Sequence, residues 1–272
     1  MPRRSFPKAL TLLCVTASLA PHVWGSQSAR TGREIAEQIN ARNDGQTVEQ
    51  VTEMELIDSG GSRITREIRT FRKYYGTDRK TVVFFVGPKN IKGTAFLTFD
   101  YADGARDDDQ WLYLPAARKV RRISASDRGG YFIGTDFTYE DIKNGTKVSL
   151  DDFEWEAGGE EACGQAQCLI LDGTAVDEET ARDIGYSRVK LWVDPNTWVA
   201  LRRRAWDIGG NLLKTVEVSD VRQVDGIWTP HLVDADNHKT KHRTIFKITQ
   251  VKNDAAIDDS LFNQDQLQRG VR

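Results

Sequence analysis

Residues 50–74 read QVTEMELIDSGGSRITREIRTFRKY, and this stretch decides the fold class. Apolar and polar residues alternate with a period close to two on both sides of Ser59-Gly60-Gly61-Ser62. That period is typical of β-strands, whose successive side chains point to opposite faces. A short connection of serine and glycine is typical of a turn. The stretch therefore predicts a long β-hairpin with strands over 50–58 and 63–74.

The same pattern recurs along most of the chain, interrupted by short connections rich in Gly, Pro, Asn and Asp. The further predicted strands cover residues 81–86, 94–101, 110–114, 119–123, 187–193, 198–206, 212–220, 227–234 and 242–252. Together with the first hairpin they give about ten or eleven strands. This predicts a mainly β chain with a few helices (α+β), built on one antiparallel meander.

A helix is expected ahead of the first strand. Thr31-Gly32-Arg33-Glu34 has the spacing of a capping box, and Ile35 and Ile39 then fall on one helical face. Asn43-Asp44-Gly45 is expected to end it. Because so short a helix is marginal in water by itself, it needs an apolar surface on which to dock.

Two further short helices are expected, one at Thr138-Tyr139-Glu140-Asp141, which repeats the capping-box spacing, and one over 177–184. The strands meanwhile predict a sheet with one apolar face, which has to be covered. Three short helices are few for a sheet of about ten strands. Either an apolar concavity remains and binds hydrophobic ligands, or the sheet folds onto itself as a filled sandwich. The alternation leaves both alternatives open.

The predicted strand over 110–114 is apolar on both faces, because Trp111 and Tyr113 alternate with Leu112 and Leu114. Such a strand is covered twice, or it faces a ligand or a partner. The candidate ligand-binding residues of the apolar face are Phe96, Trp111, Tyr113, Val189, Leu191, Val193, Val216 and Val218. The candidate lid residues are Ile35, Ile39 and Tyr139.

The first residues resemble a secretion signal. Basic residues without acids precede an apolar run over 9–19, which is about 11 residues and shorter than the about 20 that a membrane-spanning helix needs. We expect a signal peptide over 1–25, cleaved before Ser26, with an uncleaved anchor as the alternative. Cys14 lacks the small residue that a lipidation signal places before it, so no lipid attachment is expected. The mature chain is then a single periplasmic domain over 26–272.

The charge of the chain is ordinary. There are 38 Lys and Arg against 40 Asp and Glu. Cleavage removes three of these cations (Arg3, Arg4 and Lys8) and no acid, which leaves 35 against 40, a net charge of −5. A nucleic-acid partner would need a clustered basic face, so none is expected. No second apolar segment approaches membrane-spanning length, and no transmembrane segment is expected in the mature chain.

The residues that could carry chemistry are few. Cys163 and Cys168, separated by a segment that contains a glycine, predict a disulfide across a tight turn in an oxidising compartment. His238 and His242 lie about 13 Å apart in an extended chain, too far for one metal ion. The acidic run at 107–109 lacks the register of a calcium loop. No catalytic motif is present, so we expect no catalytic residue, no metal and no cofactor.

Five blocks carry a resemblance to a known family: GPKNIKGTAFL (87–97), DDDQWLYLPA (107–116), KVRRI (119–123), FIGTDFTYED (132–141) and IDDSLF (257–262). The chain resembles the outer-membrane lipoprotein-sorting proteins, which are relatives of the periplasmic lipoprotein carrier LolA. This resemblance implies a curved antiparallel sheet that forms an unclosed half-barrel, whose apolar concave face is lidded by helices and accepts acyl chains. It also implies work beside inner-membrane exporters of the RND superfamily. The chain lacks an obvious counterpart of the carrier's lid-locking arginine, so no binding residue is carried over.

The resemblance and the pattern favour a periplasmic carrier of lipid or lipid-modified cargo between the inner and outer membranes, not an enzyme. The alternative is a docking subunit of a membrane transporter that holds no cargo. In that case Trp111, Tyr113, Trp192 and Trp206 would be surface anchors.

Overall fold

The structure is a computed structural model that describes the chain except for residues 2–29, 105, 165 and 272. The expected signal peptide over 1–25, its cleavage site and Cys14 lie outside the described residues. Among the described helices, none combines the length and the apolar character needed to cross a membrane.

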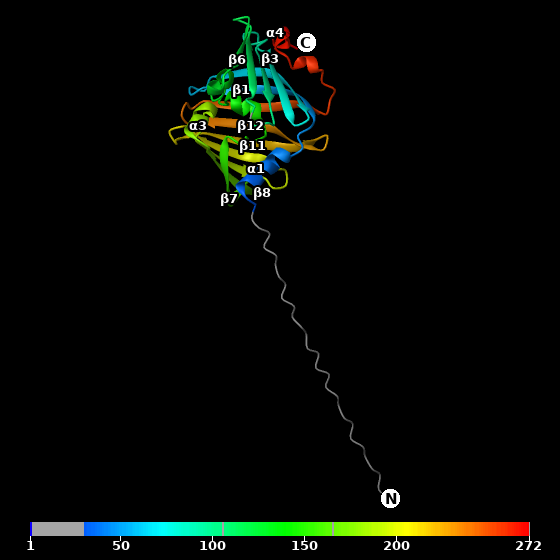
Figure 1. Cartoon of the computed structure of the whole chain (residues 1–272), viewed down its shortest axis with the longest axis vertical. Coiled ribbons are helices and arrows are strands. Elements are labelled where there is room, and N and C mark those ends of the chain that lie inside the picture. Colours follow the sequence, from blue (N-terminus) through cyan, green and yellow to red (C-terminus); the bar gives the residue numbers. More distant parts are fainter. Residues whose placement is uncertain (2–29, 105, 165, 272) are drawn as a thin grey trace.

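The described residues form one antiparallel sheet of thirteen strands, which confirms the predicted fold class and raises the strand count (Figure 1). The strands are β1 Thr47–Ile57, β2 Arg63–Tyr75, β3 Asp78–Gly87, β4 Ala95–Asp100, β5 Asp109–Leu114, β6 Lys119–Ile123, β7 Phe153–Cys163, β8 Ala166–Ala175, β9 Arg188–Val193, β10 Ala200–Trp206, β11 Leu212–Val224, β12 Ile227–Asn237 and β13 Arg243–Asn253. The two strands that the pattern did not predict are β7 and β8. In β7 the apolar period is limited to Phe153, Trp155 and Ala157, and the strand beyond them is exposed as far as Cys163.

The strand order is β6-β5-β4-β3-β2-β1-β13-β12-β11-β10-β9-β8-β7. The chain therefore forms two meanders, β1 to β6 and β7 to β13, instead of the single one expected. β1, the first strand of the first meander, pairs with β13, the last strand of the second. In this β1–β13 pair Val48 lies opposite Asn253 and Ile57 opposite Arg243, with a bulge between Val51 and Thr52. Figure 1 shows β6 and β7 at opposite ends of the sheet, which is curved but not closed.

The three expected helices are present as α1 Gly32–Ala41, α2 Tyr139–Asn144 and α3 Glu178–Ile184, and a fourth, α4 Gln264–Arg269, follows the last strand. Short 3₁₀ turns lie at η1 Ala125–Asp127, η2 Phe132–Gly134 and η3 Asp259–Leu261. Both predicted capping boxes are formed, with Thr31 paired to Glu34 and Thr138 to Asp141.

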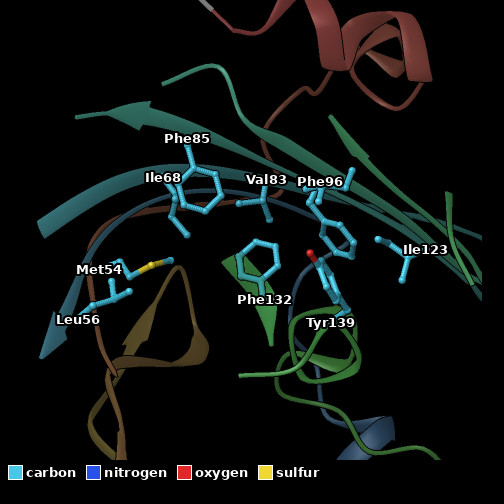
Figure 2. Packing of buried hydrophobic residues seen from close by; sticks show 10 residues of the cluster. Met54, Leu56, Ile68, Val83, Phe85, Phe96, Ile123, Phe132 and Tyr139 are labelled. Atoms are coloured by element: carbon cyan, nitrogen blue, oxygen red, sulfur yellow. The ribbon is translucent and has the colours of Figure 1, made fainter. Parts of the chain in front are cut away.

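Strands β2 to β5 are covered on both faces. On the inner, concave face Phe132 and Tyr139 pack against Phe85 and Phe96, as Figure 2 shows. On the outer face the C-terminal segment with α4 packs Leu267 and its neighbours against the sheet. Figure 2 shows that segment on the side of the strands opposite to Phe132. This double cover is the reason why the strand over 110–114 is apolar on both sides.

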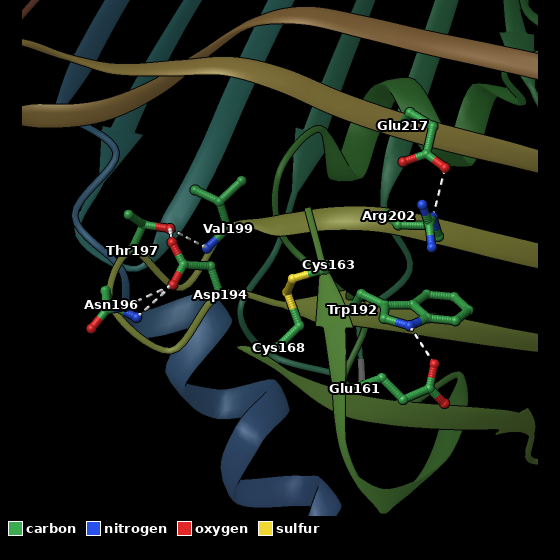
Figure 3. The surroundings of a disulfide bond; sticks show 10 residues. All are labelled: Glu161, Cys163, Cys168, Trp192, Asp194, Asn196, Thr197, Val199, Arg202 and Glu217. Atoms are coloured by element: carbon green, nitrogen blue, oxygen red, sulfur yellow. Dashed lines mark hydrogen bonds and ion pairs between the residues drawn. A yellow bond between two sulfur atoms is a disulfide. The ribbon is translucent and has the colours of Figure 1, made fainter. Parts of the chain in front are cut away.

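At the other end of the sheet α1 covers the inner face of β7 to β9. Ile35 and Ile39 pack against Leu171, Leu191 and Val193 in one buried cluster. The disulfide Cys163–Cys168 closes the β7–β8 hairpin, as predicted from its spacing (Figure 3).

We expect Gly32→Ala to destabilise the fold. A glycine-to-alanine change in a helix ordinarily stabilises by roughly 0.5–1 kcal/mol. Here a Cβ on Gly32 would overlap the backbone carbonyl of Trp155, so the expected effect is a loss of about 1–3 kcal/mol. Urea denaturation measures it, with the exposed Gln38→Ala on the same helix as control. A gain in stability for Gly32→Ala would contradict this close packing.

Candidate functional site

A cavity of about 240 Å³ lies on the inner face, between the middle strands of the sheet and α2. Its walls come from β1, β2, β3, β12 and β13, and its cover from α2 and the loop before it. The apolar residues that line it are Val48, Ile68, Val83, Phe132, Phe137, Ile142, Ile227, Trp228, Pro230, Val233, Phe246, Ile248 and Val251. The volume falls just below the about 300–1,000 Å³ of pockets for drug-sized ligands, so a bulkier guest requires movement of the cover.

The cover is anchored by aromatic packing. The ring of Phe132 lies 5.4 Å from that of Phe96 and 5.6 Å from that of Tyr139, centroid to centroid (Figure 2). Phe137 stacks on Phe246 at 4.6 Å. These contacts place the loop over residues 132–141 on the inner face, with Ile142 of α2 turned to the cavity.

A buried ionic network also holds α2. The carboxylate of Asp141 accepts hydrogen bonds from Arg203 (2.7 Å), Lys214 (2.6 Å) and the hydroxyl of Tyr186 (2.6 Å). Lys214 also donates to the backbone oxygen of Asp136 at 2.6 Å. The network thus ties the first turn of α2 to β10 and β11.

The environment shifts the pKa values of this network. Burial raises the pKa of Asp141, but Arg203 and Lys214 outweigh it and hold that pKa well below its usual range. Burial lowers the pKa of Lys214 to about 8, more than Asp141 raises it. Burial and the neighbouring carboxylate raise the pKa of Tyr186. Asp141 is therefore ionised at neutral pH and serves as the counter-ion of two cations.

The second acid of the loop is satisfied in a different way. Asp136 accepts a hydrogen bond from Thr244 (2.7 Å), and its carboxylate lies 2.6 Å from Nδ1 of His242. The other histidine of the 238–242 pair contacts Thr215 at 2.8 Å, so the two imidazoles have separate partners. Asp136 fastens the loop to β13, as Asp141 fastens it to β10 and β11.

Charged side chains line the cavity at the end where Arg42 and Trp228 reach the surface. Arg72 forms an ion pair there with Asp44. The deeper lining cations have acidic partners of their own: Arg79 pairs with Asp100, and Lys143 with Asp108 and Glu140.

The cavity uses other residues than those predicted for ligand binding. Phe96 and Val216 pack behind its lining, and Val218 lies opposite the lining residue Val233. Val189, Leu191 and Val193 lie on the inner face near the other end of the sheet, beneath α1 and the segment that follows α2. A ligand-binding role for these residues stays a prediction.

Trp111 and Tyr113 lie on the outer face beside α4, so the expectation that they share the concave face with Phe96 is corrected. The lid candidate Tyr139 does lie in the cover of the cavity. Ile35 and Ile39 cover β8 and β9 instead.

The sequence reasoning missed the ionic residues of the site. One signal was present: Lys214 precedes Val216 and Val218 at a spacing of two, which places a lysine on the apolar face. A cation on such a face needs a buried partner. For Asp44, Arg72 and Asp141 no comparable signal exists, because their partners are distant in the sequence.

The chain resembles known proteins in a family model and in solved structures, but not among curated proteins. A family model described only as "uncharacterized protein"-like matches residues 77–269. A search of curated proteins finds no match. Among solved structures, the chain is similar to one from Vibrio parahaemolyticus ascribed to an outer membrane lipoprotein-sorting protein domain. The TM-score is 0.79 at 29% identity, over 88% of this chain and 98% of that one.

It is equally similar to a DUF1329 family protein from Desulfovibrio piger, with a TM-score of 0.80 at 29% identity, over 87% and 98% of the two chains. A LolA superfamily protein from Nitrosomonas europaea shares the fold, with a TM-score of 0.66 at 18% identity, over 87% and 99%.

We expect Asp141→Asn to lower the free energy of unfolding by about 3–5 kcal/mol at pH 7, because it leaves two buried cations without their counter-ion. Urea denaturation measures the loss. Glu178→Gln removes a carboxylate that is fully in solvent on α3 and serves as control. A variant as stable as the parent chain would show that the network does not hold α2.

The same network predicts a pH dependence. Since the pKa of Asp141 is lowered by folding, its stabilising contribution is present above its unfolded pKa of about 3.9 and is lost as the pH falls towards the folded pKa. The difference in unfolding free energy between the parent chain and Asp141→Asn should therefore shrink below about pH 4. Denaturation series from pH 7 to pH 3 measure it, and a constant difference would contradict the assignment.

Proposed function

We propose that the chain carries a lipid or a lipid-modified protein. It belongs to the uncharacterized family whose model matches residues 77–269, and it shares the fold of the outer membrane lipoprotein-sorting domain and of the LolA superfamily protein. An acyl chain of the cargo would occupy the cavity under α2. The observation that carries the proposal is a mostly apolar volume on the inner face that the protein's own side chains leave unfilled. A binding role is proposed rather than a catalytic one, because Asp136 and Asp141 are engaged in holding the cover.

The physical need for such a cavity is plain. A hydrocarbon chain that crosses water exposes methylene groups at a cost of about 0.8 kcal/mol each. Walls such as Val83, Phe246 and Ile248 remove that cost by replacing water around the chain. The proposed transfer is between the inner and outer membranes, in the periplasm, after removal of the predicted signal peptide.

Loading and release would require α2 to move. The helix has six residues, too few to be stable away from the sheet, so its position depends on its anchors. Opening would break the ion pairs of Asp141 but return these charges to water, which offsets much of the loss. A cover fixed by buried ions is therefore well positioned when closed without being prohibitively costly to open.

The proposal includes work beside an RND-type exporter of the inner membrane, which the family resemblance supports. The cargo-free docking subunit is less well supported. The indole of Trp192 is buried and donates to Glu161 at 2.8 Å, so it is not the surface anchor that this alternative requires (Figure 3). Trp111 and Tyr113 are half-buried beside the C-terminal segment.

We expect Ile248→Trp to weaken the binding of a fluorescent fatty acid by about tenfold. The added indole would displace about two methylenes of the guest, each worth about 0.8 kcal/mol. Ile248 lines the cavity, whereas Gln250 on the same strand is exposed, so Gln250→Trp is the matched control. Native mass spectrometry of the protein gently purified from cells would show bound lipid in the parent chain and the control. A parent chain that is always empty and ignores the probe would contradict the carrier proposal.

A further inference from the structure

The end of the cavity that reaches the surface carries a group of charges on three separate segments. Arg42 caps the end of α1, Asp44 lies between α1 and β1, Arg72 comes from β2, and Lys147 follows α2. Arg42, Asp44 and Arg72 line the cavity itself. We call these four residues the basic cluster.

A single carboxylate serves the three cations of the basic cluster. Asp44 forms an ion pair with Arg72, and its Oδ1 lies 3.4 Å from Nζ of Lys147. Arg42 makes no ion pair with any described residue, and it donates instead to the backbone oxygen of Trp228 (2.9 Å) and to the hydroxyl of Thr146 (2.7 Å). Three cations and one carboxylate leave an excess of two positive charges.

The excess is larger than at the cover. There Arg203 and Lys214 share the carboxylate of Asp141, and the carboxylate of Asp136, which pairs with His242, also lies near enough to raise the pKa of Lys214. Unbalanced positive charge that is partly removed from water is costly, and a bound anion lowers that cost.

Hydrogen-bond donors are also left over. Among the described residues, the Nε atoms of Arg42 and Arg72, and that of the neighbouring lining residue Arg79, are buried and have no hydrogen-bond partner. Buried polar atoms in native proteins are nearly always paired, so unused donors next to a cavity indicate a ligand with acceptor atoms. The pKa shifts point the same way, since burial lowers the pKa of Lys147 to about 8 despite the attraction of Asp44.

We propose that the cavity takes an anionic amphiphile, with its carboxylate or phosphate head on the basic cluster and its hydrocarbon chain along the apolar walls towards Phe132. This inference rests on the proposed carrier function and names the class of cargo. The apolar lining residues Val48, Ile227 and Trp228 lie at the same end as Arg42 and Arg72, so head and chain sites are continuous. Guanidinium groups bind carboxylate and phosphate with charge-assisted hydrogen bonds, which suits them to this role.

The test compares three probes with the same chain: hexadecanoate, hexadecanol and hexadecyltrimethylammonium, each titrated below its aggregation limit at pH 7 and low salt. We expect hexadecanoate to bind at least about tenfold more tightly than the alcohol, as a charge-assisted hydrogen bond allows, and the cation most weakly. Equal affinity for acid and alcohol would overturn the inference and leave the carrier function standing. Binding of none of the three would overturn the carrier function itself.

Single-residue variants test where the charged head group of the ligand binds. Arg42→Gln should lower the affinity for hexadecanoate by about tenfold and leave the affinity for hexadecanol within twofold of that of the parent chain. Binding of the alcohol therefore also shows that the variant is folded. Arg182→Gln, on α3 and largely exposed, is the matched control and should change neither. An acid affinity unchanged by Arg42→Gln would overturn the assignment. Inorganic phosphate alone should fail to displace the fluorescent fatty acid at concentrations at which hexadecanoate displaces it. Displacement by phosphate as strong as that by hexadecanoate would indicate a site for free anions instead. The comparison of probes on the parent chain stands even if a variant fails to fold.

Discussion

The inner face of the curved sheet presents more apolar surface than its short helices can cover, and the rest of the structure depends on this constraint. Helix α1 covers the strands at one end, and the loop that leads into α2 covers those at the other. Between them lie β1, β12 and β13, where the two meanders meet. The cavity is found there, because the six-residue α2 covers the seam without filling the space beneath it. The outer face has no such gap at β2 to β5, since the C-terminal segment packs against it.

Buried charge decides where the cover of the cavity stays. Hydrophobic packing alone is non-directional and would allow a six-residue helix several positions. Asp141 removes that freedom, because its carboxylate is satisfied only where Arg203, Lys214 and Tyr186 converge on it. Such a network contributes little net stability compared with apolar packing, yet it penalises every other position of the helix. A cover that has to open needs a defined closed position more than it needs strong attachment to the sheet.

Local signals explain how much of this could be predicted from the sequence. The strands with an apolar period of two and the helices with capping boxes were predicted, because each signal lies within a few neighbouring residues. β7 escaped prediction because its apolar alternation stops after Ala157, and the rest of this edge strand is exposed and rich in glutamate and glycine. The pairing of β1 with β13 joins residues nearly 200 positions apart, such as Glu55 and Ile245, and no local pattern specifies it. An apolar cavity was one of the two alternatives predicted from the sequence, but its position was not predicted, because it depends on where α1 and α2 dock.

The two charged groups around the cavity differ in a way that fits their separate roles. At the cover, Arg203 and Lys214 each form an ion pair with Asp141, and the carboxylate of Asp136 lies nearby, so each cation has an acidic partner without a ligand. At the surface end, Asp44 alone faces Arg42, Arg72 and Lys147, and unused donors remain. A protein that only had to be stable would gain by a second acid there, because unbalanced buried charge is costly. The imbalance is consistent with a site completed by its cargo, whose head would supply the missing negative charge while its chain fills the space under α2.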